Sequence, residues 1–340
     1  MKPRIIIDAN IPYIQGTFDK VAEVEYLNAK EITPQKVKSA DALIIRTRTL
    51  CNADLLDSSN VKLIATATIG IDHIDTNYCN THNITWSTAP GCNAESVAQW
   101  VGSVLAVWSN KHNCPLSGKT IGIVGHGHVG KRVEQLARLL EMNILLNDPP
   151  LAINNPEQYV DLQTIAHQCD IITFHTPLTQ EGEFATYNLG GKEFFKHVKE
   201  NTLIINAARG WIIDEESLLK SKCECAIDCW AGEPKTNAEL RAKALIATPH
   251  IAGYSADGKL NATQQVVQAV ANFFNIQPET IKGLPPKSTT TATGDTLKDQ
   301  LLQNYNILAD SNTLKSEPEK FEHFRSNYPV RRELKIENQY

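Results

Sequence analysis

The chain lacks a surplus of charge of either sign. Its 340 residues include 33 Lys and Arg against 38 Asp and Glu, which gives a net charge of −5. So small a balance offers no general electrostatic attraction to nucleic acid or to an anionic membrane surface. We therefore expect small molecules and other proteins as partners, and neither nucleic acid nor a membrane.

Long hydrophobic runs are also missing, and the cysteines form no pairing framework. The opening stretch MKPRIIIDAN reaches a charged residue after three isoleucines, so it has neither a signal-peptide core nor a membrane span. The eight cysteines are spread over a long chain, as expected for buried thiols in a reducing compartment. Both absences predict a cytoplasmic protein.

What the chain does contain is a repeated alternation of strand-like and helix-like segments. A chain of this length should form two or three domains, because single cores rarely grow beyond about 250 to 300 residues. Short β-rich runs alternate with helical segments, and the first four runs are 4–8, 41–46, 61–68 and 83–89. This order predicts an α/β protein with a parallel sheet. An apolar helical stripe from Val97 to Trp108 then precedes a second such series, which ends near 245–255.

The end of the chain has a different composition. The stretch GLPPKSTTTATGDT, residues 283–296, is typical of a linker or long loop. It is followed by an apolar stripe at Leu297, Leu301, Tyr305 and Leu308. Fewer than about fifty residues follow the linker, which is too few to hold a core alone. We therefore expect this tail to pack on the body of the protein or on a partner.

A glycine motif opens the second series. Gly125, Gly127 and Gly130 form a GxGxxG pattern between the strand-like TIGIV and an amphipathic helix. Such glycines allow a tight turn and close backbone approach, so that a pyrophosphate can bind at the helix N-terminus. Asp148, eighteen residues after Gly130, is placed to bind a ribose diol and would repel a 2′-phosphate, which favours NAD over NADP. The alternative interpretation is an ordinary tight turn between strand and helix.

Three further side chains follow predicted strands of the same sheet. Arg209 follows the run LIINAA, Glu233 follows the strand that ends near Asp228, and His250 follows another strand. Strand ends of a parallel sheet meet at one edge, so these groups could converge on a nicotinamide. Oxidation of a 2-hydroxy acid needs this set: His250 as base, Glu233 to orient it, and Arg209 to clamp the carboxylate.

Each of these residues also has an ordinary explanation. A lone arginine after a strand is often a surface ion pair, and a Glu-Pro dipeptide or a histidine after Thr-Pro is often part of a turn. The closely spaced thiols of CECAIDC, residues 223–229, resemble a metal site but lie on a predicted buried strand, so we expect no metal. His126 and His128 lie inside the glycine turn, where we expect them to line the phosphate face of a cofactor.

The motifs together resemble the D-isomer-specific 2-hydroxyacid dehydrogenase family. The resemblance rests on their order along nearly the whole chain: ATATIGIDHID, APGCNA, GIVGHGHVG, TFHTPL, INAARG, DCWAGEP and PHIAGY. It implies two doubly wound, Rossmann-like domains and a small α+β C-terminal dimerisation segment. The domains would be a substrate domain of 1–95 and 257–282, an NAD-binding domain of 96–256, and the C-terminal segment 283–340.

The resemblance also implies roles for individual residues. Arg209, Glu233 and His250 would be catalytic. NAD would contact Gly125, Gly127, His128, Val129, Gly130, Asp148, Thr176, Ala207, Ala208, Arg209, Asp228 and Gly253. The substrate would contact Thr47, Thr68 and Tyr254, and Arg46 is our added candidate for binding an anion. A homodimer is expected.

Four shorter features indicate the kind of substrate. DANIPY, APGCNA, NDPP and NYPVRREL resemble one member of the family that acts on a small phosphorylated 2-hydroxy acid. Two alternatives remain open at this point. Another member of the family would share the catalytic residues and differ in its substrate pocket, and a non-enzymatic protein could use the same fold to sense NAD.

Overall fold

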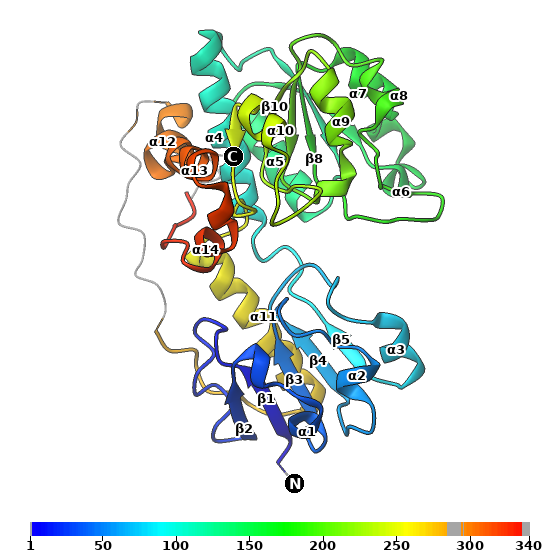
Figure 1. Ribbon diagram of the computed structural model, residues 1–340, viewed down its shortest axis with the longest axis vertical. Coiled ribbons are helices and arrows are strands. Elements are labelled where there is room, and N and C mark those ends of the chain that lie inside the picture. Colours follow the sequence, from blue (N-terminus) through cyan, green and yellow to red (C-terminus); the bar gives the residue numbers. More distant parts are fainter. Residues whose placement is uncertain (1, 284–293, 295, 335–340) are drawn as a thin grey trace. The chain divides into compact units, whose positions relative to one another are not determined.

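The computed structural model describes residues 2–283, 294 and 296–334 (Figure 1). The described residues fall into two compact units. The first contains those of 1–93 and 256–287, and the second those of 94–255 and 288–340. Most of the predicted linker 283–296 lies outside the described residues.

The first unit is built on a five-stranded parallel sheet in the order β2-β1-β3-β4-β5. The strands are β1 (Arg4–Asp8), β2 (Glu23–Leu27), β3 (Ala42–Ile45), β4 (Leu63–Thr66) and β5 (Thr85–Ser87). The helical segments are η1 (Ala29–Glu31), α1 (Pro34–Val37), α2 (Ala53–Leu56), α3 (Thr76–Thr81) and α11 (Ala256–Phe274). This strand order is that of the flavodoxin-like folds, with its reversal between β1 and β3.

Alternation along β1 explains why both faces of this sheet are covered. Ile5 and Ile7 point to one face, where they pack in a cluster with Val266 and Val270 of α11. Ile6, between them, belongs to the cluster on the other face, which includes residues of α1, α2 and α3. The predicted parallel sheet is therefore confirmed, and a near-continuous run of isoleucines suits a strand buried on both faces.

One strand of this sheet was not expected from the sequence. β2 has the sequence EVEYL, and its residues are only partly buried or exposed at the edge of the sheet. An edge strand with one solvated side does not need a continuous apolar run. The two glutamates of β2 interrupt its apolar residues, so the sequence does not have the pattern of a buried strand.

The second unit contains a six-stranded parallel sheet in the order β11-β10-β9-β8-β6-β7. Its strands are β6 (Thr120–Val124), β7 (Asn143–Asn147), β8 (Ile171–Phe174), β9 (Leu203–Asn206), β10 (Glu224–Ile227) and β11 (Ile246–Ala247). Between them lie α5 (His128–Leu139), α6 (Pro149–Ala152), η2 (Pro156–Gln158), α7 (Leu162–Gln168), α8 (Lys192–Phe195), η3 (Gly210–Ile212), α9 (Glu215–Lys220) and α10 (Ala238–Lys243). The chain goes from β6 to β7 on one side and then to β8 on the other, so the strand order reverses at β6.

Helices cover both faces of this sheet. The long helix α4 (Ala94–His112) and α5 share one core cluster with Ile121, Ile123 and Ile205. Residues of α7 to α10 share the other cluster with Ile172 and Ile204 (Figure 1). The open edge of the sheet where the strands end therefore remains as the place for a ligand at the reversal of strand order.

The C-terminal segment packs on the second unit. It contains α12 (Leu297–Asn304), α13 (Ile307–Ser316), η4 (Pro318–Lys320) and α14 (Phe321–Ser326), with α12 and α13 beside α4 in Figure 1. The predicted stripe is split into two helices because Asn306 starts a new one, accepting from Ala309 N at 3.2 Å. Ser311 Oγ accepts from Ala247 N at 3.0 Å, so α13 covers the edge strand β11.

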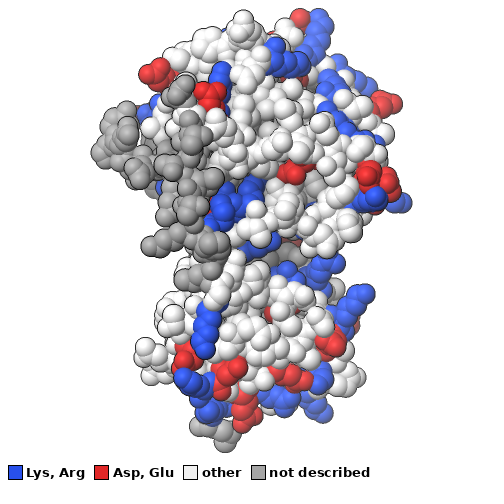
Figure 2. All heavy atoms as spheres, turned by 90° about the vertical axis from the view of Figure 1, so that its left-hand side faces the viewer, with Lys and Arg blue, Asp and Glu red and all other residues white. Residues whose placement is uncertain are grey.

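The described part of this segment is helical, and no strand is found among its residues 294 and 296–334. Its role in dimerisation stays a prediction. None of the described helices anywhere in the chain is long and apolar enough to cross a membrane. On the face shown in Figure 2, basic and acidic side chains lie next to one another over the first unit. The first unit contains ion pairs such as that of Lys62 with Asp41, at 2.9 Å.

Candidate active site

The glycine motif forms the turn between β6 and α5. Gly125 has φ +92°, and a Cβ on it would lie 2.8 Å from the backbone nitrogen of Thr176. A Cβ on Gly130 would lie 2.1 Å from Gly125 O. A Cβ on Gly127, in contrast, would meet nothing within 4 Å. Two glycines therefore permit close backbone packing, and the third leaves open space above the turn.

The start of α5 presents backbone amides to that space. Gly127 is the N-cap residue and has no side chain to accept from the first turn of the helix, which begins with His128, Val129 and Gly130. The first helical bond is donated by Lys131 N to Gly127 O at 3.0 Å. Unpaired first-turn amides and the positive end of the helix dipole form a site for an anion such as a pyrophosphate.

Asp148 lies at the end of β7, beside the glycine turn. Its Oδ2 accepts a hydrogen bond from His126 N at 2.8 Å, and its Oδ1 accepts from Leu151 N at 3.2 Å. These bonds fix the carboxylate, and each oxygen keeps further acceptor capacity for the hydroxyls of a ribose. The structure therefore places Asp148 close to the turn that would bind a pyrophosphate, and its contact with the ribose stays a prediction.

The structure corrects the expectation for the ring of His126. Its two ring nitrogens lie 3.0 Å from Tyr159 OH and 2.7 Å from Glu134 Oε2. The buried ring therefore links α5, which carries Glu134, to the segment that carries Tyr159. His128, at the first position of α5, is exposed. Of the two histidines, only His128 is placed to line the phosphate face of a cofactor.

Two buried polar atoms at the end of β8 have no hydrogen-bond partner among the described residues. They are Nδ1 of His175 and Oγ1 of Thr176. Burial lowers the pKa of His175 to about 3, so the ring is neutral, and its Nε2 lies 2.9 Å from Thr173 Oγ1. Buried polar atoms are normally hydrogen-bonded, and NAD bound at this strand end would supply the missing hydrogen-bond partners. His175 was not predicted, although it follows the strand beside the reversal of strand order.

Arg209 is held by a turn that follows β9. Asn206 Nδ2 donates to Arg209 O at 2.8 Å, and Asn206 Oδ1 accepts from Ala208 N at 3.1 Å. A Cβ on Gly210 would lie 2.0 Å from the carbonyl of Trp230, so only glycine allows the turn to pack against the 230 loop. The strand end, the asparagine and the glycine together place Arg209 just beyond the end of β9, and its Nη1 donates to Ala208 O at 2.8 Å.

Asp228 anchors the loop that carries His250. Its carboxylate is buried and accepts hydrogen bonds from Thr248 Oγ1 at 2.5 Å, Ile251 N at 2.8 Å and Ala252 N at 2.9 Å. The backbone N of His250 donates to Asp228 O at 2.9 Å. Asp228 was predicted to contact NAD; the structure assigns it a positioning role, and the contact stays a prediction.

His250 and Glu233 form the central pair of the site. His250 Nδ1 lies 2.8 Å from Glu233 Oε2, while Glu233 Oε1 accepts from Trp230 N at 2.9 Å. Burial favours the protonated carboxyl, but the bonds from His250 and Trp230 N outweigh it and lower the pKa of Glu233. A charged Glu233 therefore holds Nδ1–H of His250, which leaves Nε2 to exchange a proton with a substrate. His250 has φ +56°, a conformation that the bonds to Asp228 stabilise.

Cys229 lies next to this pair. Its Sγ and the ligand atoms of Glu233 and His250 lie within 4.8 Å of one another. Burial raises the pKa of the Cys229 thiol well above its ordinary value. A thiol must lose its proton to ligate a metal, so this cluster suits a base with its orienting carboxylate better than a metal ion.

The predicted substrate residues lie in the first unit, except for one. Arg46 follows β3, and its Nε donates to Oδ2 of the fully buried Asp8 at 3.2 Å. Thr68 follows the neighbouring strand β4, and its hydroxyl lies 2.7 Å from Thr66 Oγ1 and donates to Gly70 O at 3.0 Å.

Thr47, beside Arg46, is exposed. Arg46, Thr47 and Thr68 therefore share the carboxyl edge of one sheet. Tyr254, like Gly253, lies in the second unit, so its place beside them stays a prediction.

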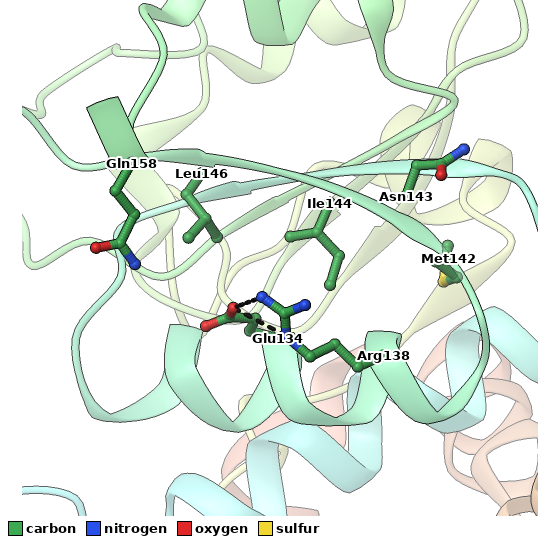
Figure 3. A pocket seen from close by; sticks show the side chains of 7 residues that line it. All are labelled: Glu134, Arg138, Met142, Asn143, Ile144, Leu146 and Gln158. Atoms are coloured by element: carbon green, nitrogen blue, oxygen red, sulfur yellow. Dashed lines mark hydrogen bonds and ion pairs between the residues drawn. The ribbon is translucent and has the colours of Figure 1, made fainter. Parts of the chain in front are cut away.

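A hollow of about 370 Å³ lies elsewhere on the second unit, between α5 and the edge strand β7 (Figure 3). Glu134 and Arg138 of α5 pair inside it, across from Ile144 and Leu146 of β7. None of the predicted site residues lines this hollow. It is a groove between a helix and a sheet edge, and the chemistry lies at the strand ends instead.

Comparisons with known proteins agree with this geometry. The model of the D-isomer specific 2-hydroxyacid dehydrogenase NAD binding domain matches residues 96–252. An erythronate-4-phosphate dehydrogenase of Bacteroides thetaiotaomicron is 45% identical, over 98% of this chain and 98% of its own. The chain belongs to the D-isomer-specific 2-hydroxyacid dehydrogenase family. It is an NAD-binding oxidoreductase.

Further relatives show the same relationship. The erythronate-4-phosphate dehydrogenase of Porphyromonas gingivalis is 38% identical, over 98% of this chain and 94% of that protein. Among solved structures, NAD+-bound 3-phosphoglycerate dehydrogenase of Entamoeba histolytica has a TM-score of 0.69 and 27% identity, covering 83% of this chain and 98% of its own. The α/β fold with two parallel sheets predicted from the sequence is therefore confirmed.

Proposed function

We propose that the chain oxidises 4-phospho-D-erythronate at C2 with NAD, giving 2-oxo-3-hydroxy-4-phosphobutanoate for the synthesis of pyridoxal 5′-phosphate. The observation that carries the proposal is the His250–Glu233 pair, at 2.8 Å, in the unit that also holds Arg209 at a strand end. Full-length similarity to erythronate-4-phosphate dehydrogenases, at 38 to 46% identity, supports this substrate among the acids the family oxidises.

The chemistry needs a base, an anion clamp and a hydride acceptor. His250 Nε2 takes the proton of the C2 hydroxyl, and Glu233 stabilises the imidazolium that forms. Arg209 binds the substrate carboxylate with its planar fork and fixes C2 in place. NAD, held by the residues of the second unit, would supply the acceptor for the hydride that leaves C2.

The residues of the second unit fit NAD. The pyrophosphate would occupy the open space above Gly127 and accept hydrogen bonds from the amides that begin α5. Asp148 would bind the adenosine ribose. His175 Nδ1 and Thr176 Oγ1 are buried atoms that lack a partner in the described chain. Ala207, Ala208, Arg209, Asp228 and Gly253 complete the proposed set of NAD contacts.

Arg46, Thr47, Thr68 and Tyr254 are the proposed substrate contacts. We also propose that the enzyme is a cytoplasmic homodimer that uses no metal. The eight cysteines of the sequence are free in the structure and mostly buried, which fits a reducing compartment.

A second candidate is the oxidation of 3-phosphoglycerate. Its support is the fold similarity to NAD+-bound 3-phosphoglycerate dehydrogenase, at 27% identity. The higher identity to erythronate-4-phosphate dehydrogenases, over nearly the full length, favours the four-carbon acid. A purely NAD-sensing protein would not need the assembled pair of His250 and Glu233.

The direct test measures NADH formation from 4-phospho-D-erythronate and from 3-phosphoglycerate by the purified protein. We expect turnover of the first acid, and we expect His250→Asn to abolish it while NADH still binds, as measured by fluorescence. Undiminished turnover in that variant would remove His250 as the base. Turnover of 3-phosphoglycerate alone would overturn the proposed substrate.

A further inference from the structure

The C-terminal segment reaches the loops that carry His250 and Glu233 inside the second unit. Phe321, the first residue of α14, is fully buried in the same core cluster as Trp230. The ring of Tyr328 lies 6.0 Å from the ring of Tyr254, edge to face. The segment between these two contacts therefore runs past the site.

Arg331 attaches the segment to the loop after His250. Its Nη2 donates to the backbone carbonyls of Ile251 and Ala252, and its guanidinium lies 4.4 Å from the centre of the Tyr305 ring. The side chain is almost fully buried. Its Nε and Nη1 are buried without a hydrogen-bond partner in the described part of the chain, but only 6% of the residue is exposed. Arg331 therefore fixes the segment in place and offers a ligand little accessible surface.

Arg325 lies between these two anchors. One turn after Phe321, it places its guanidinium 5.9 Å from the centre of that ring, and Nη1 pairs with Glu322 Oε1 at 3.1 Å. Its Nε is buried without a hydrogen-bond partner in the described part of the chain, while 23% of the side chain stays exposed. The guanidinium therefore keeps a donor, Nε–H, that no residue in the described part of the chain accepts from, and it can still donate to an anion.

Electrostatic interactions link Arg325 to Glu233, one member of the catalytic pair. Burial disfavours its charge, but Tyr254, Glu322 and Glu233 outweigh burial and raise the pKa of Arg325. Arg325 in turn contributes to the lowered pKa of Glu233, after the larger effects of burial and of the bonds from His250 and Trp230 N. The two groups therefore feel one another's charge across the site.

We propose that Arg325 binds the phosphate of the substrate, an inference that rests on the proposed function. In 4-phospho-D-erythronate the phosphorus lies four bonds from C2. A group that binds it must therefore lie near His250 yet apart from Arg209, which binds the carboxylate at the other end. Guanidinium groups bind phosphate through paired, charge-assisted hydrogen bonds. The C-terminal segment thus selects a phosphorylated acid.

Arg325→Gln tests this contact because it removes the charge and keeps most of the packing over Phe321. Lys320→Gln is the matched control, since it removes a charge from the same segment at a side chain that is 52% exposed and paired with Glu317. For each protein we would measure KM and kcat with 4-phospho-D-erythronate and with D-erythronate, inhibition by inorganic phosphate, and the Kd of NADH.

We expect Arg325→Gln to raise KM for the phosphorylated acid about 10- to 100-fold and to weaken inhibition by inorganic phosphate by a similar factor. Its kcat/KM for D-erythronate should fall far less than its kcat/KM for the phosphorylated acid, its Kd for NADH should match that of the wild type, and Lys320→Gln should match the wild type throughout. Arg325→Lys should fall between, because it restores the charge without the fork. It also serves as the test if the glutamine variant fails to fold.

Two results would overturn the proposal. An unchanged KM for the phosphorylated acid in Arg325→Gln would show that the phosphate is bound elsewhere. An equal loss with both acids would show a structural role. A wild-type protein that does not turn over 4-phospho-D-erythronate would instead overturn the proposed function, so the two proposals fail separately.

Discussion

Replacing Glu233 by glutamine should trap His250 in the wrong tautomer. Trp230 N donates to one carboxylate oxygen at 2.9 Å, so the amide oxygen of a glutamine must take that position. Its NH2 group then faces His250 Nδ1, which lies 2.8 Å from the other oxygen. Nδ1 must become the acceptor, and Nε2 must carry the proton. In this neutral tautomer Nε2 already carries a hydrogen, so it cannot take the proton of the C2 hydroxyl.

The expected loss is large because it removes both the base and the charge that stabilises the imidazolium. An equivalent change in the catalytic triad of serine proteases lowers kcat about 10⁴-fold, and we expect a fall of about 10³- to 10⁴-fold here. This corresponds to about 4 to 5.5 kcal/mol of lost transition-state stabilisation. Glu233→Asp is the control, since it keeps a carboxylate and should retain more activity than the glutamine variant.

The assay follows the steady-state rate of NADH formation at varied 4-phospho-D-erythronate and saturating NAD, with the Kd of NADH measured on the same preparations. We expect kcat to fall while the Kd of NADH stays unchanged. If Glu233→Gln kept kcat within about threefold of the wild type, the tautomer argument would be refuted. If NADH binding were lost as well, the carboxylate would act mainly on the structure of the loop.

Three other changes probe the rest of the account. Asp148→Asn keeps the hydrogen-bond acceptor but removes the charge, so the ratio of kcat/KM for NAD over NADP should fall about tenfold; an unchanged ratio would mean that the ribose is read elsewhere. Gly210→Ala should lower both the melting temperature and kcat, because its Cβ would lie 2.0 Å from the Trp230 carbonyl, and wild-type values would contradict the observed packing. Asp170 is partly buried, which favours its protonated form, but hydrogen bonds from Thr120 N and Lys199 outweigh this effect and lower its pKa. The charged carboxylate therefore stabilises the fold at pH values above its ordinary pKa, and this stabilisation is lost as the pH falls. Asp170→Asn should therefore lower the melting temperature at about pH 7 and hardly change it near pH 3, and an equal loss at both pH values would refute this.

Strong local patterns allowed much of the fold to be predicted. The isoleucines of β1 and the residues of β3 and β4 are buried on both faces, and such strands are visible as apolar runs. β2 was missed because an edge strand needs no such run. The break between α12 and α13 was missed because the apolar stripe continues across Asn306, where a cap starts a new helix.

The candidate site shows a similar division. The pairing of Glu233 with His250 follows the expectation that residues after the strands of one parallel sheet meet at one edge, while the convergence of Arg209 on them stays a prediction. The role of Asp228 in fixing the His250 loop could not be predicted, because it depends on backbone amides that fold back from Ile251 and Ala252. Arg325 lies more than 70 residues beyond His250, and only tertiary packing of α14 brings it near the pair.

The choice of substrate is the central claim, and it can be measured in the direction of reduction. NADH consumption would be followed in parallel with 2-oxo-3-hydroxy-4-phosphobutanoate, 3-phosphohydroxypyruvate and pyruvate. We predict the highest kcat/KM for the first, about tenfold or more above the shorter phosphorylated acid and about 10⁴-fold above pyruvate, which lacks the phosphate. A higher kcat/KM for either of the other two acids would contradict the account.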